Sequence, residues 1–131
     1  MSYKALKVWQ KSFACVPRIY KLTATFPASE QYGLVSQMRR SAVSIPSNIA
    51  EGSQSISDKE FGNFLLIARG SIAELETQIL LSIELQYASV KNVQSILDEL
   101  EAISRMLHSF LSKLKAHRSK PAVHSLSSTT L

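Results

Sequence analysis

The chain has little of what disulfide-bonded, membrane-spanning or strand-rich proteins need. Cys15 is its only cysteine, so no intrachain disulfide can form, and a cytoplasmic location is the default expectation. Four glycines and four prolines among 131 residues allow few turns, which favours long helices over many short strands. Polar side chains interrupt every apolar run before it could cross a bilayer, and residues 1–10 lack the apolar stretch of a signal peptide. The sequence therefore predicts a soluble, all-α protein.

The patterns of catalytic and metal-binding sites are also missing. Di-metal sites in helical bundles carry a Glu-x-x-His pair on each of two helices, and neither Glu74 nor Glu101 is followed by a histidine at that spacing. The histidines are interpreted as one helix-surface residue and two tail residues: His108, His117 and His124. Ser44 and Ser47 have no His or Lys three or four residues away to act as a base. We therefore predict no enzyme, no cofactor and no metal.

Charge is unevenly divided along the chain. Residues 1–40 contain seven basic residues and one acidic residue. Residues 41–104 contain three basic and nine acidic residues, and residues 105–131 contain five basic residues and no acidic residue. Two basic ends around an acidic middle favour either contact with an anionic polymer or self-association through opposite charges.

Hydrophobic periodicity predicts four amphipathic helices. The first covers residues 4–25, and its apolar side chains recur on one predicted core face: Leu6, Trp9, Phe13, Val16 and Tyr20. Pro17 lies inside this helix and is expected to kink it. Cys15 is interpreted as a small buried hydrophobe rather than a reactive thiol.

The second helix is predicted to begin near Ser29, a good N-cap residue, and to stop at Gly52. Its narrow apolar stripe consists of Leu34, Met38, Ser41, Ile45 and Ile49. Pro46 deprives the Ala42 carbonyl of its usual partner, so a bend or a polar contact is expected there. Small residues along this helix favour close approach of a neighbouring helix.

The third helix, residues 57–87, opens with a capping box in which Ser57 and Glu60 can bond reciprocally to backbone amides. Gly70 is expected to lower the stability of this helix by about 1 kcal/mol relative to alanine. Gly70, Ala68 and Ser71 together predict a second patch of small residues. The fourth helix, residues 91–116, has a regular apolar face: Val93, Ile96, Leu100, Ile103, Leu107, Phe110 and Leu114.

Short connections between these helices predict an up-down-up-down antiparallel four-helix bundle over residues 1–116. Residues 117–131 lack periodicity and are predicted to form a disordered basic tail. In this topology Arg39 comes level with Gly70 on the next helix, one turn from Glu74, which predicts a structural ion pair between Arg39 or Arg40 and Glu74.

A basic stripe is the feature most open to a functional interpretation. The bundle topology places the start of the first helix and the end of the last at one end, which predicts a nucleic-acid-binding cluster of Lys4, Lys7, Lys11, Arg18, Lys113, Lys115 and Arg118. A solvated helix face with a basic tail explains the same residues equally well, and both interpretations stay open.

One long motif is more specific than these patterns: Gln37-Met-Arg-Arg-Ser-Ala-Val-Ser-Ile-Pro-Ser-Asn-Ile-Ala-Glu-Gly52, which includes Arg39, Arg40, Pro46, Asn48 and Glu51. Shorter matching segments are Val8-Trp9-Gln10, Glu30-x-Tyr-Gly-Leu34, Ala68-x-Gly-Ser71 and Glu74-Leu-Glu-Thr-Gln78. Over residues 3–115 the chain resembles the four-helix-bundle proteins encoded in intervening sequences of bacterial large-subunit ribosomal RNA genes. Pro17 and Ser41 depart from the family pattern.

The resemblance implies an all-helical protein that assembles as a ring, commonly a homopentamer, without enzymatic activity. The chain is also distantly similar to the accessory variability determinant of diversity-generating retroelements, a pentameric bundle that binds a reverse transcriptase and nucleic acid. We therefore expect an oligomeric bundle that associates with RNA or DNA through basic surfaces and has no membrane partner. The alternative is a protein-interaction adaptor or scaffold ring.

Overall fold

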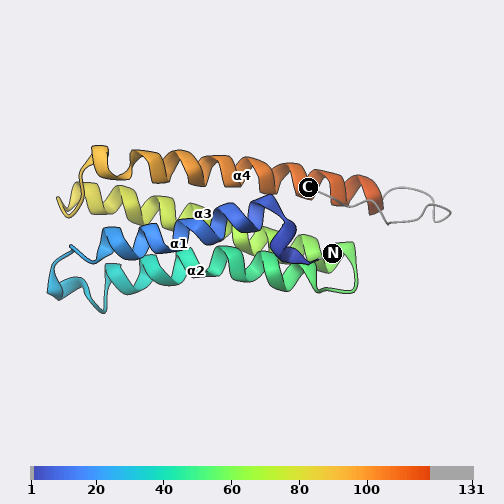
Figure 1. Ribbon diagram of the computed structural model, residues 1–131, viewed down its shortest axis with the longest axis horizontal. Coiled ribbons are helices and arrows are strands. Elements are labelled where there is room, and N and C mark those ends of the chain that lie inside the picture. Colours follow the sequence, from blue (N-terminus) through green and yellow to red (C-terminus); the bar gives the residue numbers. More distant parts are fainter. Residues whose placement is uncertain (1, 119–131) are drawn as a thin grey trace.

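Four antiparallel α-helices make up the computed structural model, which describes residues 2–118 (Figure 1). They are α1 (Lys7–Thr23), α2 (Leu34–Ser53), α3 (Asp58–Glu84) and α4 (Val90–Arg118), and two short 3₁₀ helices, η1 (Tyr3–Ala5) and η2 (Ala28–Glu30), precede α1 and α2. Helices α1 and α3 each pack against both α2 and α4, and the α2–α3 contact is the most extensive. The predicted up-down-up-down all-α bundle is confirmed.

The ends of the chain differ in detail from the predicted boundaries. The first predicted turn is the separate η1, because Leu6 adopts an extended conformation between η1 and α1. Helix α4 continues to Arg118, two residues beyond its predicted end; the rest of the predicted tail, including His124, lies outside the described residues. Within residues 2–118, no helix combines the length and the apolar character that crossing a membrane requires.

The predicted core faces of α2 and α4 are confirmed. The whole apolar stripe of α4, from Val93 to Leu114, is buried. The stripe of α2 is buried as predicted, with Met38, Ile45 and Ile49 almost completely removed from solvent. A single apolar face on each helix leaves only one orientation that buries it, which is why periodicity succeeded here.

The predicted core face of α1 is only partly right: Leu6 is buried and Trp9 and Val16 pack against the core, but the other two predicted residues are exposed. Val8, Cys15 and Ile19 point into the core, whereas Phe13 is 56% exposed and Tyr20 is 42% exposed. Helix α1 carries apolar side chains at helical spacing on two faces, and the face with the smaller side chains is the one that faces the core. Burial, the largest cause, raises the pKa of the Cys15 thiol, which fits the interpretation of a buried hydrophobe.

Helix α2 begins five residues later than predicted, at Leu34, and Glu30 rather than Ser29 accepts a hydrogen bond from its first amide. The Leu34 amide donates to Glu30 Oε1 at 3.1 Å, and the Tyr87 hydroxyl donates to Glu30 Oε2 at 2.8 Å. These two donors hold the pKa of Glu30 below its ordinary value. Gln86 adopts a left-handed conformation, φ 63°, that ends α3 and returns the chain toward Glu30.

The α2–α3 hairpin shows one predicted cap and two corrections. Ser57 Oγ accepts a hydrogen bond from the Glu60 amide at 3.1 Å, which is one of the two bonds of the predicted capping box. Gly52 does not stop α2, which continues to Ser53; it is buried against α3 instead. Gly70 is exposed with no atom within 4 Å of an added Cβ, so it does not belong to a packing patch, although Ala68 and Ser71 are buried.

Candidate interaction surfaces

The structure disperses the predicted basic cluster over several places. Lys11 Nζ lies 3.1 Å from Glu99 Oε1 in the first half of α4, and Arg18 donates a hydrogen bond to Ser95 on the same helix. Lys4 belongs to η1, which among the described residues contacts α1 and α2 but not α4. These basic side chains therefore do not form one continuous patch.

Four of the predicted lysines do remain at one end of the bundle. Helix α1 starts and α4 ends on the same side (Figure 1), which places Lys4 and Lys7 at the end that carries Lys113 and Lys115. Arg118 ends α4, and its side chain lies outside the described part of the chain. Helix α3 also begins there and adds acidic residues, including Asp58, whose Oδ2 lies 3.4 Å from His117 Nδ1. The local charge is consequently mixed.

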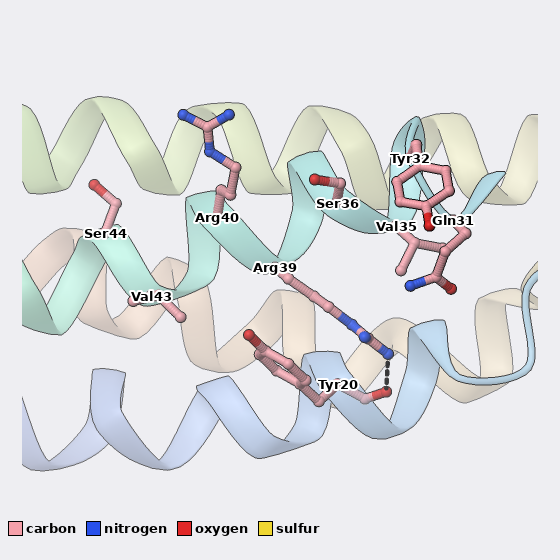
Figure 2. A pocket seen from close by; sticks show the side chains of 9 residues that line it. All are labelled: Tyr20, Gln31, Tyr32, Val35, Ser36, Arg39, Arg40, Val43 and Ser44. Carbon is pink, nitrogen blue, oxygen red and sulfur yellow. Dashed lines mark hydrogen bonds between the residues drawn. The ribbon is translucent and has the colours of Figure 1, made fainter.

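The predicted ion pair between Arg39 or Arg40 and Glu74 is absent among residues 2–118. Arg39 turns toward α1 (Figure 2), where its Nε donates to Thr23 Oγ1 at 3.0 Å and its guanidinium carbon lies 4.5 Å from the Tyr20 ring centroid. Arg40 projects to the opposite side of α2, toward α3 (Figure 2). Adjacent residues on a helix are about 100° apart, so the two arginines serve different surfaces.

An apolar groove runs between α1 and α2 on the outside of the bundle. We define the α1–α2 groove as the hollow of about 390 Å³ lined chiefly by Trp9, Phe13, Val16, Pro17, Val43 and Pro46. The Trp9 and Phe13 rings stack with centroids 4.7 Å apart. Beyond Val43 the surface continues into a hollow of about 570 Å³ beside Tyr20, Tyr32 and Arg39 (Figure 2). The aromatic residues predicted for the core therefore line an external groove.

Helix α3 exposes a second apolar surface. We define the α3 stripe as Leu66, Ile67, Gly70, Ala73, Leu80 and Leu81, all exposed. Leu81, for example, is 48% exposed. The segments 64–67 and 79–83 consist almost entirely of apolar residues, so α3 has apolar side chains on both its inner and outer faces. These two apolar segments are the sequence signal for this surface, although residues 69–78 between them include Arg69, Glu74 and Glu76. A search for one core face per helix does not detect such segments.

A polar groove of about 360 Å³ separates α2 from α3. Its lining residues are Gln37, Arg40, Ser41, Ser44, Ser71, Glu74 and Gln78. Ser44 Oγ and Ser71 Oγ are hydrogen-bonded at 2.8 Å, and the Asn48 amide donates to the Ser44 carbonyl and hydroxyl at 2.8 and 2.9 Å. Ser44 and Asn48 flank Pro46, but this network does not include the Ala42 carbonyl, for which a polar contact was predicted. All seven lining residues fall in the segments that carry the family resemblance.

The described residues contain no group of three or more His, Cys, Asp or Glu side chains that could hold a metal ion. Fold and surfaces together define a small antiparallel helical bundle with two apolar surfaces and one polar groove. The chain belongs to the 23S rRNA-intervening sequence protein family, whose model matches residues 4–109. The predicted family resemblance is thereby confirmed.

Comparison with solved structures supports the same assignment. The chain is similar to a protein with unknown function from the S23 ribosomal protein family of Bacteroides thetaiotaomicron VPI-5482, at 30% sequence identity and a TM-score of 0.72. The similarity covers 79% of this chain and 97% of that chain. The comparison with curated proteins gives no match. The family has no established function.

Proposed function

We propose that the protein is a non-enzymatic scaffold that self-associates head to tail, with the α3 stripe of one copy packed into the α1–α2 groove of the next. The observation that carries this proposal is the presence of two separate exposed apolar surfaces on different sides of one bundle. Contiguous exposed apolar surface on a small protein marks an interaction site. Trp and Phe, which line the groove, are typical anchors of protein–protein interfaces.

The charges around the two apolar surfaces are complementary. Arg39 lines the far end of the surface that includes the α1–α2 groove, whereas Glu84 is exposed on α3 beside the stripe. Opposite charges at an interface rim steer association and fix its orientation. An interface formed by two different faces is heterologous and closes into a ring when the rotation between copies permits. The homopentamer implied by the family resemblance is one such ring.

We expect Phe13→Glu and Leu81→Glu each to prevent assembly while leaving the helical content unchanged, because each places a charge in one apolar surface and both side chains are exposed in the single chain. Analytical ultracentrifugation should show oligomers for the wild type and monomers for each variant. Ile56→Glu is the matched control, because Ile56 is 97% exposed in the α2–α3 connection, outside both surfaces. It should assemble like the wild type.

Mixing the two variants tests the head-to-tail arrangement directly. Phe13→Glu keeps an intact α3 stripe and Leu81→Glu keeps an intact groove, so together they should form a 1:1 heterodimer and nothing larger. A wild-type protein that stays monomeric at millimolar concentration rejects self-association. Assembly of Leu81→Glu alone through its groove would show that the interface is not head to tail.

Nucleic-acid association is a second candidate function, favoured by the lysines at one end of the bundle. Lys4, Lys7 and Lys113 form no ion pair among the described residues. The Lys4→Ala/Lys7→Ala double variant should bind a structured RNA or a DNA duplex more weakly, and its salt dependence should fall by about one unit of slope for each phosphate that it no longer neutralises. Fluorescence anisotropy at about 50 and 200 mM salt measures both quantities.

A second double variant controls for net charge in this titration. Lys21→Ala/Lys91→Ala removes the same charge from the opposite end of the bundle, where α1 ends and α4 begins (Figure 1). Equal weakening by the two double variants would assign any binding to net charge alone. No binding by the wild type at the lower salt concentration rejects this candidate.

A further inference from the structure

The α3 stripe has two high regions with a low waist between them. Its large exposed side chains form an N-terminal pair and a C-terminal pair: Leu66 with Ile67, and Leu80 with Leu81. At a rise of 1.5 Å per residue, the two pairs lie roughly 20 Å apart along the helix. The exposed residues between the pairs include three small ones, which form the waist: Gly70, Ala73 and Thr77. Such a stripe fits a surface in which two hollows flank a ridge.

The outer surface of α1 and α2 has this complementary shape. The α1–α2 groove of about 390 Å³ lies on one side of Val43, and the hollow of about 570 Å³ lies on the other side. We call the second one the Tyr20 hollow, after the ring beside Arg39 (Figure 2). Val43 is exposed and lines both hollows, so it forms the ridge between them. The waist can receive this ridge, because no atom lies within 4 Å of a Cβ atom added to Gly70.

The two ends of this receiving surface carry charges of opposite sign. Arg39 lines the Tyr20 hollow. Glu51 is exposed at the other end, next to Ala50, which lines the α1–α2 groove. Arg39 and Glu51 are 12 residues apart in α2, which corresponds to about 18 Å. A partner helix therefore meets a positive charge at one end and a negative charge at the other.

The α3 stripe carries the matching charges at a similar spacing. Glu84 is exposed one turn after Leu81, and Arg69 is exposed one turn after Leu66. These two charges are 15 residues apart, or about 22 Å, which matches the spacing on α2 when the helices cross obliquely, as packed helices do. Neither Glu84 nor Arg69 forms an ion pair among residues 2–118, and neither of the two charges on α2 does so.

We propose that α3 of one copy enters the surface of the next copy in a single polarity. The C-terminal pair lies in the Tyr20 hollow, the N-terminal pair lies in the α1–α2 groove, and the waist lies over Val43. Opposite charges then meet at both ends of the interface: Glu84 with Arg39, and Arg69 with Glu51. The reversed polarity would bring like charges together at both ends, which disfavours it. This inference rests on the proposed self-association and specifies its register.

Charge reversal tests the polarity at the end that contains Glu51. Arg69→Glu and Glu51→Arg should each weaken assembly in analytical ultracentrifugation by about fivefold or more, because each puts like charges opposite each other. The double variant should assemble like the wild type, since the pair returns with its signs exchanged. Lys91→Glu, an equal change of charge at the start of α4, is the matched control and should assemble normally. Unchanged or stronger assembly of both single variants would overturn the proposed polarity.

Disulfide cross-linking distinguishes the polarity from self-association itself. The Leu66→Cys/Ser47→Cys variant should form disulfide-linked oligomers on a non-reducing gel, because Ser47 lines the α1–α2 groove that receives the N-terminal pair. Leu66→Cys/Ser36→Cys is the matched control and should assemble without cross-links, because Ser36 lines the Tyr20 hollow instead. The native Cys15 is buried and does not compete.

The possible failures of this experiment have different meanings. Cross-links through Ser36 but not through Ser47, or no cross-links in either variant although both assemble, would overturn the polarity and leave self-association intact. A wild-type protein that stays monomeric would reject self-association and the polarity with it.

Discussion

Replacing Ile45 with Asp should prevent the bundle from folding. Ile45 is 1% exposed at the centre of the buried α2 stripe, and the substitution removes its apolar contacts and buries an unpaired carboxylate. Losses above about 4 kcal/mol are expected from such a change, against a total stability of roughly 5–15 kcal/mol for a domain of this size. Circular dichroism should show the loss of the cooperative thermal transition.

Val43→Asp is the matched control for this experiment. Val43 lies two residues earlier on the same helix and is 40% exposed, so its variant should melt within a few degrees of the Phe13→Glu monomer. It lines the α1–α2 groove, and its substitution should therefore weaken self-association without unfolding the chain. An Ile45→Asp protein that melts like the wild type would mean that α2 turns a different face to the core.

Most of the fold could be predicted from sequence because α2 and α4 each have a core face that periodicity identifies. Helix α1 could not be oriented in this way. Its larger residues, such as Trp9 and Phe13, form one helical stripe and its smaller residues, such as Cys15 and Ile19, form another, with the same period. The choice between them depends on how closely α1 approaches its neighbours. That distance is set by side chains on other helices, which a one-helix pattern does not contain.

The start of α2 illustrates the same limit. Ser29 has the features of a local cap, yet the carboxylate of Glu30 caps the helix and also accepts a hydrogen bond from Tyr87 at the end of α3. That contact joins residues 57 positions apart in sequence. Local capping preferences therefore predicted a helix in the right region and could not predict its first residue.

The candidate surfaces were predictable only in part. Sequence identified the basic residues, but the contact of Lys11 with Glu99 depends on the register between two helices. The polar groove was easier to predict from sequence, because Gln37, Arg40 and Ser44 recur at three- and four-residue spacing on one helix face. Such a polar row beside a core stripe predicts a hydrophilic boundary between helices. The facing residues on α3, and hence the groove, required the structure.

Gly52→Ala should destabilise the bundle by about 1–3 kcal/mol, even though alanine favours a helix over glycine. A Cβ atom at this position would lie 2.8 Å from both Phe61 Cδ1 and Phe64 Cβ. Phe64 Cβ is attached directly to the backbone, so it cannot move aside unless α3 moves. The missing side chain of Gly52 therefore permits the close approach of α2 and α3, which is the most extensive helix contact in the bundle.

Gly70→Ala provides the matched comparison, since it makes the same chemical change inside α3. No atom lies within 4 Å of the added methyl group, so this variant should gain up to about 1 kcal/mol from helix propensity alone. Both substitutions are best measured by urea unfolding in the Phe13→Glu background, where assembly through the α3 stripe does not contribute. If the two substitutions changed the free energy of unfolding with opposite signs, Gly52 would be established as a residue of the α2–α3 contact. If both variants gained stability, α2 and α3 would have to pack less closely than the structure shows, and the polar groove beside them would be wider.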